Sequence, residues 1–411
     1  MPILFVHGVN TRSRDGFIAL KPYLERYIAP VISGDPSGVT IDDAYWGEMA
    51  AKFAWDGASR PRSRLLGQGA ESQLAAVDLL ASSASSLDLP AMPARARPSS
   101  GGLISGAATT LAPTSRLSQL SPDELSNYLA LLLQSAVTDP SKRADISIHA
   151  DDLAHDEQFR AQLAAAPNAE GERSLVLAHL QPASPALVGM GAPAWVDKLG
   201  DRIDETLRRA ADLPAFALAT VAGELRKPLN DFVSFFIGDV LAYLRTRGTT
   251  ASPGPIPQLL LGKLRELSAA SRSRGGEPII VLSHSMGGQL VYDLVTAFLP
   301  ADPELAATRV DFWCATASQV GFFEEMKLFL ASNSDYRTGH EVPFPAQLGG
   351  WWNVWDYDDF VSYTVRDIFA GVDDGNFDSG MSLLVAHSGY LQCPSFFRRF
   401  GDKITSFLKS R

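Results

Sequence analysis

The sequence predicts an α/β protein in which helices flank a mostly parallel β-sheet. Short apolar runs bounded by small residues, such as 279–282 and 310–316, are typical of parallel strands that are covered on both faces. Segments with helical apolar spacing lie between these runs, so strand and helix alternate along the chain. The chain has 411 residues, 46% of them apolar, which suffices for one large domain with an insertion or for two domains.

The first elements follow the same alternation. An apolar strand is expected over residues 2–8, and it ends in a His-Gly turn. A helix at about 15–27 and a strand-like run at 39–47 come next. The order strand, helix, strand predicts that the two strands pair in parallel.

Residues 51–235 differ in composition and predict a mainly helical insertion between two parts of the core, 1–50 and 236–411. Ala, Ser, Pro and Leu dominate there, and the Pro-, Ser-, Gly- and Ala-rich stretch near 90–115 is expected to be a flexible loop. A serine followed by proline and two acids predicts a helix start at residue 121. Further helices are expected at 193–211 and 216–244, while 174–180 is a strand or a helix.

The strand at 279–282 runs into the sequence Ser-His-Ser-Met-Gly-Gly at 283–288. A Ser-x-Ser-x-Gly turn between a strand and a helix has the nucleophile-elbow pattern, with Ser283 in place of the first glycine. Its central residue, Ser285, would be strained, so the residues two before and two after must be small, as Ser283 and Gly287 are. The helix N-terminus would favour a nearby oxyanion. The alternative is a glycine-rich turn with an incidental serine.

This turn resembles the serine turn of α/β-hydrolases, especially lipases and esterases with His-Ser-Met/Leu-Gly-Gly. The resemblance implies the α/β-hydrolase fold, without its first two strands, and a nucleophilic Ser285. It also implies that the amides of Val9 and Met286 form the oxyanion hole. The residues assigned to support this site are His7, Gly8, Asn10, His284 and Gly287. The resemblance covers about half of the chain and excludes the insertion, which is expected to be a lid or cap, or else a lateral packing domain.

Three carboxylates follow the strand-like run that begins at 351: Asp356, Asp358 and Asp359. The resemblance to the hydrolase segment Asn-φ-aromatic-Asp-x-x-Asp-x-Val, in which φ is apolar, makes Asp359 the acid of a catalytic triad. Asp356 would then brace the loop, and Asp358 would be solvated. Of the seven histidines, only His387 follows this acid, and the chain order Ser, Asp, His is the one that the fold uses. The other histidines are at positions 7, 149, 155, 179, 284 and 340.

These residues predict a serine hydrolase of carboxylic esters, lipase- or esterase-like, that works through an acyl-enzyme. The apolar insertion favours a small-molecule or lipid ester with an apolar acyl group, and neither a metal nor an organic cofactor is implied. One alternative is a thioesterase or acyltransferase with the same triad. Another is a catalytically silent hydrolase fold that serves as a binding or effector module.

Charge and composition narrow the possible partners. The net charge of −10, without a Lys/Arg block, argues against nucleic acid and anionic membrane surfaces as electrostatic partners. The two cysteines, Cys314 and Cys393, lack metal-ligand spacing and are expected to be reduced, with a disulfide as the alternative. Neither a signal peptide nor a membrane span is visible, so a cytoplasmic protein is expected, with leaderless export left open. The sequence does not indicate an oligomeric state.

Overall fold

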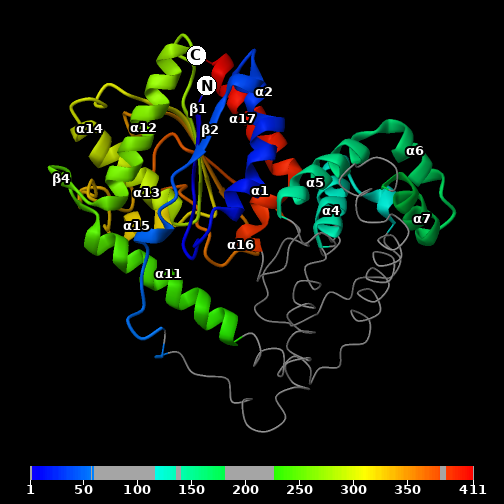
Figure 1. Cartoon of the computed structure of the whole chain (residues 1–411), viewed down its shortest axis with the longest axis horizontal. Coiled ribbons are helices and arrows are strands. Elements are labelled where there is room, and N and C mark those ends of the chain that lie inside the picture. Colours follow the sequence, from blue (N-terminus) through cyan, green and yellow to red (C-terminus); the bar gives the residue numbers. More distant parts are fainter. Residues whose placement is uncertain are drawn as a thin grey trace, which may run out of the picture.

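The computed structural model describes residues 2–56, 58–59, 116–135, 140–180, 226–379 and 386–410. Within these residues, six parallel strands form one sheet in the order β2-β1-β5-β6-β7-β8 (Figure 1). The strands are β1 (Pro2–Val6), β2 (Thr40–Asp43), β5 (Ile280–His284), β6 (Val310–Thr316), β7 (Leu348–Trp355) and β8 (Asp373–Asn376). A separate antiparallel ribbon joins β3 (Gly248–Thr249) to β4 (Ser252–Pro253). The predicted α/β class with a parallel sheet is therefore confirmed.

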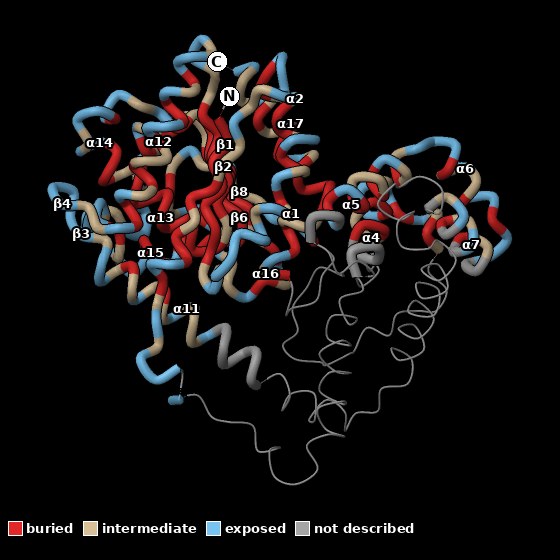
Figure 2. The backbone as a smooth tube through the Cα atoms, viewed as in Figure 1, coloured by how far each residue is buried: buried red, intermediate tan, exposed pale blue. Residues whose placement is uncertain are grey.

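Helices cover both faces of the sheet and leave its central strands buried in the middle layer (Figure 2). One face carries α1 (Asp15–Tyr23), α2 (Ala29–Ile32) and α17 (Pro394–Lys409). The other face carries α12 (Pro255–Ser273), α13 (Gly287–Asp293), α14 (Leu299–Ala301) and α15 (Val320–Glu325). Alternate residues of β1 face the two helical layers. Ile3 and Phe5 pack toward α17, whereas Leu4 and Val6 pack toward α12 and α13.

Most of the expected helices form, with interruptions that the sequence pattern did not indicate. The expected helix at 15–27 is α1 followed by a π-helical turn (Leu24–Ile28) and α2, and the helix after the serine turn is likewise α13, a π-helical turn (Leu294–Phe298) and α14. The remaining short elements are the 3₁₀ turns Pro36–Gly38, Gly47–Met49, Leu117–Gln119 and Tyr390–Gln392, and the helix α16 (Ala386–Gly389).

The described part of the expected insertion is helical. Its helices are α4 (Pro122–Ser135), α5 (Pro140–His155), α6 (Glu157–Ala165) and α7 (Ala169–Leu180), so the ambiguous segment 174–180 is a helix. They share an apolar cluster of their own, and α4 and α5 pack against α17 and α1 (Figure 1). Helix α11 (Arg226–Thr246) runs through the expected boundary at residue 236. The expected loop near 90–115, the helix at 193–211 and the start of the helix at 216–244 lie outside the described residues, and the lid role stays a prediction.

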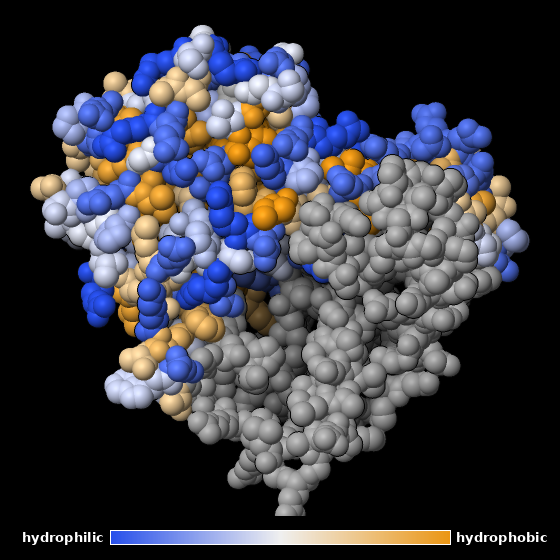
Figure 3. Space-filling view, viewed as in Figure 1, coloured by the Kyte–Doolittle hydropathy of each residue, from blue (hydrophilic) through white to orange (hydrophobic). Residues whose placement is uncertain are grey.

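The outer surface shown in Figure 3 is mostly polar, with apolar side chains in small separate areas. Among the described residues, no helix is both long and apolar enough to cross a membrane. Both cysteines are buried free thiols rather than a disulfide, and burial raises the thiol pKa of Cys314 and of Cys393.

The sheet order creates a topological switch point at the carboxyl edge of the sheet, between β1 and β5. The chain passes from β1 to β2 on one side, and β5 then pairs with β1 on the other side. The chain therefore leaves β1 toward α1 on one face of the sheet and leaves β5 toward α13 on the other face, while the first residues of the two loops remain in contact. In open parallel sheets, this switch point is where ligands bind.

Candidate active site

Ser285 occupies the strained position of a tight turn between β5 and α13. Its φ angle is +53°, in the left-handed region that non-glycine residues seldom adopt, and its amide donates a 2.8 Å hydrogen bond to the carbonyl of Thr316 in β6. A Cβ at Gly287 would lie 2.2 Å from the carbonyl oxygen of Val6, so this position requires glycine. The turn therefore has the backbone strain and close packing that its sequence predicts.

Ser283 replaces the first glycine of the pattern, and its buried hydroxyl is hydrogen-bonded. It is fully buried, and its hydroxyl oxygen accepts a 2.8 Å hydrogen bond from the indole Nε1–H of Trp313. Trp313 lies on the neighbouring strand β6, so the serine in place of glycine adds a hydrogen bond between the turn and the sheet.

The loop after β1 lies directly against Ser285. A Cβ at Gly8 would be 2.6 Å from Ser285 Cβ and 3.2 Å from Ser285 Oγ, so the Gly8 backbone touches this side chain. Within the described part of the chain, neither the Val9 amide nor the Met286 amide donates a hydrogen bond to a protein group. Two unused N–H donors thus lie in the two loops that meet at the switch point: Val9 follows Gly8, which touches the serine, and Met286 follows Ser285 itself.

His7 is held as a neutral ring. Its Nδ1 lies 2.8 Å from the carbonyl of Gly8, and its Nε2 lies 2.9 Å from the amide nitrogen of Trp46 and accepts that hydrogen bond. The ring also stacks on the Trp46 indole at a centroid distance of 4.8 Å. Burial lowers the pKa of His7 to about 4. These contacts place His7 beneath the loop as a group that orients it.

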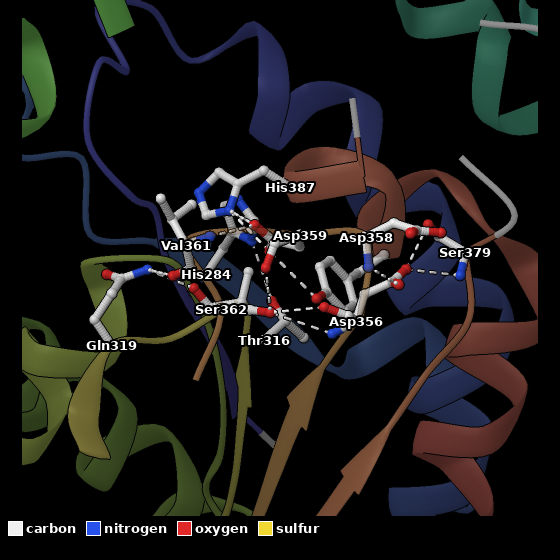
Figure 4. A network of polar contacts seen from close by, with 12 residues as sticks. His284, Thr316, Gln319, Asp356, Asp358, Asp359, Val361, Ser362, Ser379 and His387 are labelled. Carbon is white, nitrogen blue, oxygen red and sulfur yellow. Dashed lines mark hydrogen bonds and ion pairs between the residues drawn. The ribbon is translucent and has the colours of Figure 1, made fainter. Parts of the chain in front are cut away.

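Asp359 and His387 form a close pair (Figure 4). The Nδ1 atom of His387 lies 3.0 Å from both carboxylate oxygens of Asp359. The carboxylate also accepts a 3.1 Å bond from the Val361 amide and a 3.3 Å bond from the Tyr390 hydroxyl. Because a carboxylate accepts only, Nδ1 carries the hydrogen, and the lone pair of neutral His387 lies on Nε2. This is the tautomer that a general base needs.

The structure distinguishes the three neighbouring acids. The Asp356 carboxylate is buried and accepts from the Asp358 amide at 3.0 Å and from the amide and hydroxyl of Ser379 at 2.9 and 2.7 Å. Burial raises the pKa of Asp356. Asp358 is partly exposed. In this loop, Asp359 is therefore the carboxylate that faces His387, while Asp356 braces the chain.

His284 is a second imidazole beside His387, with ring centroids 4.9 Å apart. The Thr316 hydroxyl donates to the Ser283 carbonyl at 3.0 Å, so its oxygen accepts from His284 Nδ1–H at 3.2 Å. Burial, and next to it the neighbouring His387, hold the pKa of His284 well below its usual range. His284 is therefore neutral and fixed in one tautomer. Because His284 is the residue before Ser285, its contact with His387 also means that the His387 ring lies near the serine.

One contact of a working triad is not formed. The Ser285 hydroxyl is buried and has no hydrogen-bond partner among the described residues, so it does not bond to His387 here. Residues 380–385, which lead into His387, lie outside the described part. His387 itself lies on α16. In enzymes without substrate such hydrogen bonds are often long, and they shorten in the complex.

Three further residues hold the site, and the sequence pattern did not single them out. Asp239 on α11 binds the Asn10 amide at 2.9 Å, and Tyr390 supports Asp359. Gln319 donates to the Val361 carbonyl at 2.5 Å and accepts from Gln289 on α13 at 2.7 Å, which links the acid loop to the serine helix. No local motif marks these residues, because each acts across a long sequence separation.

Across the described residues, no group of three or more His, Cys, Asp or Glu side chains could hold a metal ion. No protein-family model matches the chain. A search of curated proteins likewise found no match. The function is therefore inferred from the geometry of the site.

Proposed function

We propose that the protein is a serine hydrolase with an α/β-hydrolase fold that cleaves carboxylic esters. The observation that carries this proposal is the pair of the buried Asp359 and the partly buried His387, which lies beside the strained Ser285 turn at the switch point of the sheet. The strand order alone leaves the fold family open. The assignment rests on the serine turn and on the chain order Ser, Asp, His.

In the proposed reaction, His387 Nε2 takes the proton from Ser285 Oγ as the oxygen attacks the ester carbonyl. Asp359 keeps the ring in its tautomer and stabilises the imidazolium. The Val9 and Met286 amides hold the oxyanion. His387 then gives the proton to the leaving alcohol. In the second half of the reaction, His387 takes a proton from the water molecule that attacks the acyl-enzyme and returns it to Ser285 Oγ as the acid leaves.

Apolar side chains around the acid loop support an ester with an apolar acyl group. Tyr357 and Phe360 flank Asp359 in the chain and are 66% and 74% exposed, respectively. Phe322 on α15 stacks on Tyr363 with ring centroids 5.1 Å apart. These rings give an apolar chain a surface to contact near the carboxyl edge of the sheet.

The test is covalent labelling with a fluorophosphonate, together with turnover of p-nitrophenyl esters of increasing acyl length. The wild type should be labelled on the peptide that contains Ser285, and Ser285→Ala should lose both labelling and turnover. Ser273→Ala, which removes an exposed serine at the end of α12, should keep both. Matched thioesters, and alcohols as acyl acceptors, would separate a hydrolase from a thioesterase or an acyltransferase.

The unbonded Ser285 hydroxyl favours one second candidate, a catalytically silent fold that serves as a binding module. A silent site would leave the wild type unlabelled while its thermal unfolding remains cooperative. Labelling that persists in Ser285→Ala would instead exclude this serine as the nucleophile.

A further inference from the structure

Helix α11 reaches the loop after β1 through one buried carboxylate. The side chain of Asp239 is fully buried and accepts hydrogen bonds from two backbone amides, those of Asn10 at 2.9 Å and Ala51 at 2.8 Å. Its two oxygens also receive the Arg12 guanidinium, at 2.8 Å and 3.1 Å. A buried carboxylate is costly unless it is paired and hydrogen-bonded, and here four donors satisfy it.

Arg12 is held from a second side, which fixes the charge pair in place. Its guanidinium carbon lies 5.1 Å from the ring centre of Phe235, also on α11. If the loop after β1 moved away from α11, Asp239 would lose three of its four bonds. The loop is therefore bound to the helix by a contact that is costly to break.

The contact acts on the residue next to the proposed oxyanion donor. Asn10 has a φ of +57°, a left-handed conformation that asparagine tolerates better than most residues but that the surroundings must still hold. Binding of the Asn10 amide fixes the plane of the Val9–Asn10 peptide. On the other side of Val9, Gly8 rests against Ser285. Val9 thus lies between two fixed points, and its side chain packs on the core.

We propose that Asp239 is a positioning residue that aims the Val9 N–H at the developing oxyanion. The inference rests on the proposed ester hydrolysis. Asp239 touches neither the serine nor the acyl group in this account, and it acts only through Asn10. Its loss should therefore weaken stabilisation of the transition state while substrate binding changes little.

A second buried carboxylate on the same layer supplies a matched control. Asp293 on α13 is also fully buried and also joins α11 to the core. It accepts from the Tyr243 hydroxyl at 2.8 Å, from Arg247 at 2.9 Å and from the Leu330 amide at 3.0 Å. Like Asp239 it binds an arginine and a backbone amide, but none of its partners lies in the loop after β1.

The experiment compares Asp239→Asn with Asp293→Asn in the full chain. Thermal unfolding, kcat and KM for a p-nitrophenyl ester, and the affinity of an alkyl boronic acid, which forms a tetrahedral adduct with an active serine, are measured for each. We expect Asp239→Asn to lower kcat about 10- to 100-fold with KM within about twofold, and to weaken boronate binding by a similar factor. Asp293→Asn should lower the unfolding temperature comparably but keep kcat.

Two results would overturn the inference: a kcat for Asp239→Asn equal to that of Asp293→Asn, or a change in KM alone. If Asp239→Asn does not fold, Asp239→Glu is measured instead, because it keeps the charge but displaces the carboxylate by one methylene. A wild-type kcat for Asp239→Glu would also overturn the inference. Failure of the proposed function is distinct, because the wild type would then resist fluorophosphonate labelling at Ser285. A labelled wild type with an unaffected Asp239→Asn counts against the positioning role only.

Discussion

A single methyl group at Gly8 should disable the site while the fold survives. The added Cβ would lie 2.6 Å from Ser285 Cβ and 3.1 Å from the His284 carbonyl oxygen. Ordinary carbon–carbon contacts are about 3.5–4.0 Å, so the loop or the serine must move by about 1 Å. A misplacement of that size can cost about 100-fold in rate, and overpacking costs typically about 1–3 kcal/mol of stability. We therefore expect Gly8→Ala to lower kcat about 100-fold and to remain folded.

The assay is turnover of a p-nitrophenyl ester alongside thermal unfolding, with Gly262→Ala as the matched change. A Cβ at Gly262, within α12, would meet no heavy atom inside 4 Å. Replacing glycine by alanine in a helix should stabilise the protein by up to about 1 kcal/mol and leave turnover unchanged. If Gly8→Ala turns over ester at the wild-type rate, the β1 loop does not lie against a reacting serine, and the proposed oxyanion hole fails with it.

Two other substitutions test titratable side chains of the site. Burial lowers the pKa of His7 to about 4 from 6.5, so as pH falls through this window the unfolded chain binds the proton first and stability drops. Between pH 7 and pH 4, urea unfolding of the wild type should lose about 3 kcal/mol more than that of His7→Gln, and equal losses would contradict the neutral ring. Asp359→Asn should cut kcat by about 10³- to 10⁴-fold, as in other triads, whereas the partly exposed neighbour Asp358→Asn keeps it. Similar kcat values for these two variants would remove Asp359 from its role.

Local signals in the sequence predicted the elements that local physics determines. The helix start at Ser121 is a reciprocal cap in the structure: its amide donates to the Glu124 carboxylate, and its hydroxyl accepts from the Glu124 amide. The strained serine turn was equally readable, since strain demands small neighbours that the sequence shows.

Elements that depend on distant partners were not predicted. Strand β8 has the sequence Asp-Asp-Gly-Asn, which has little intrinsic preference for a strand. It pairs with β7, and its Asp374 carboxylate accepts from the Asn353 amide group and the Trp355 indole of β7, as well as from the Thr364 hydroxyl. The contact between Asp239 and Asn10 spans 229 positions. Neither feature leaves a periodic or motif-like mark in the sequence.

Two buried carboxylates flank the proposed reaction, and the fold uses them in the same way. Asp359 fixes the tautomer of His387, and Asp239 fixes the peptide next to Val9. Each is desolvated, and each is stabilised by donors that come from more than one segment of the chain. Because these bonds form during folding, the groups that must meet a developing charge are already oriented when substrate arrives, and the chemical step requires little reorganisation. A parallel sheet with a switch point suits this arrangement, since the β1 and β5 loops meet there while α11 and the loop after β7 supply the two carboxylates.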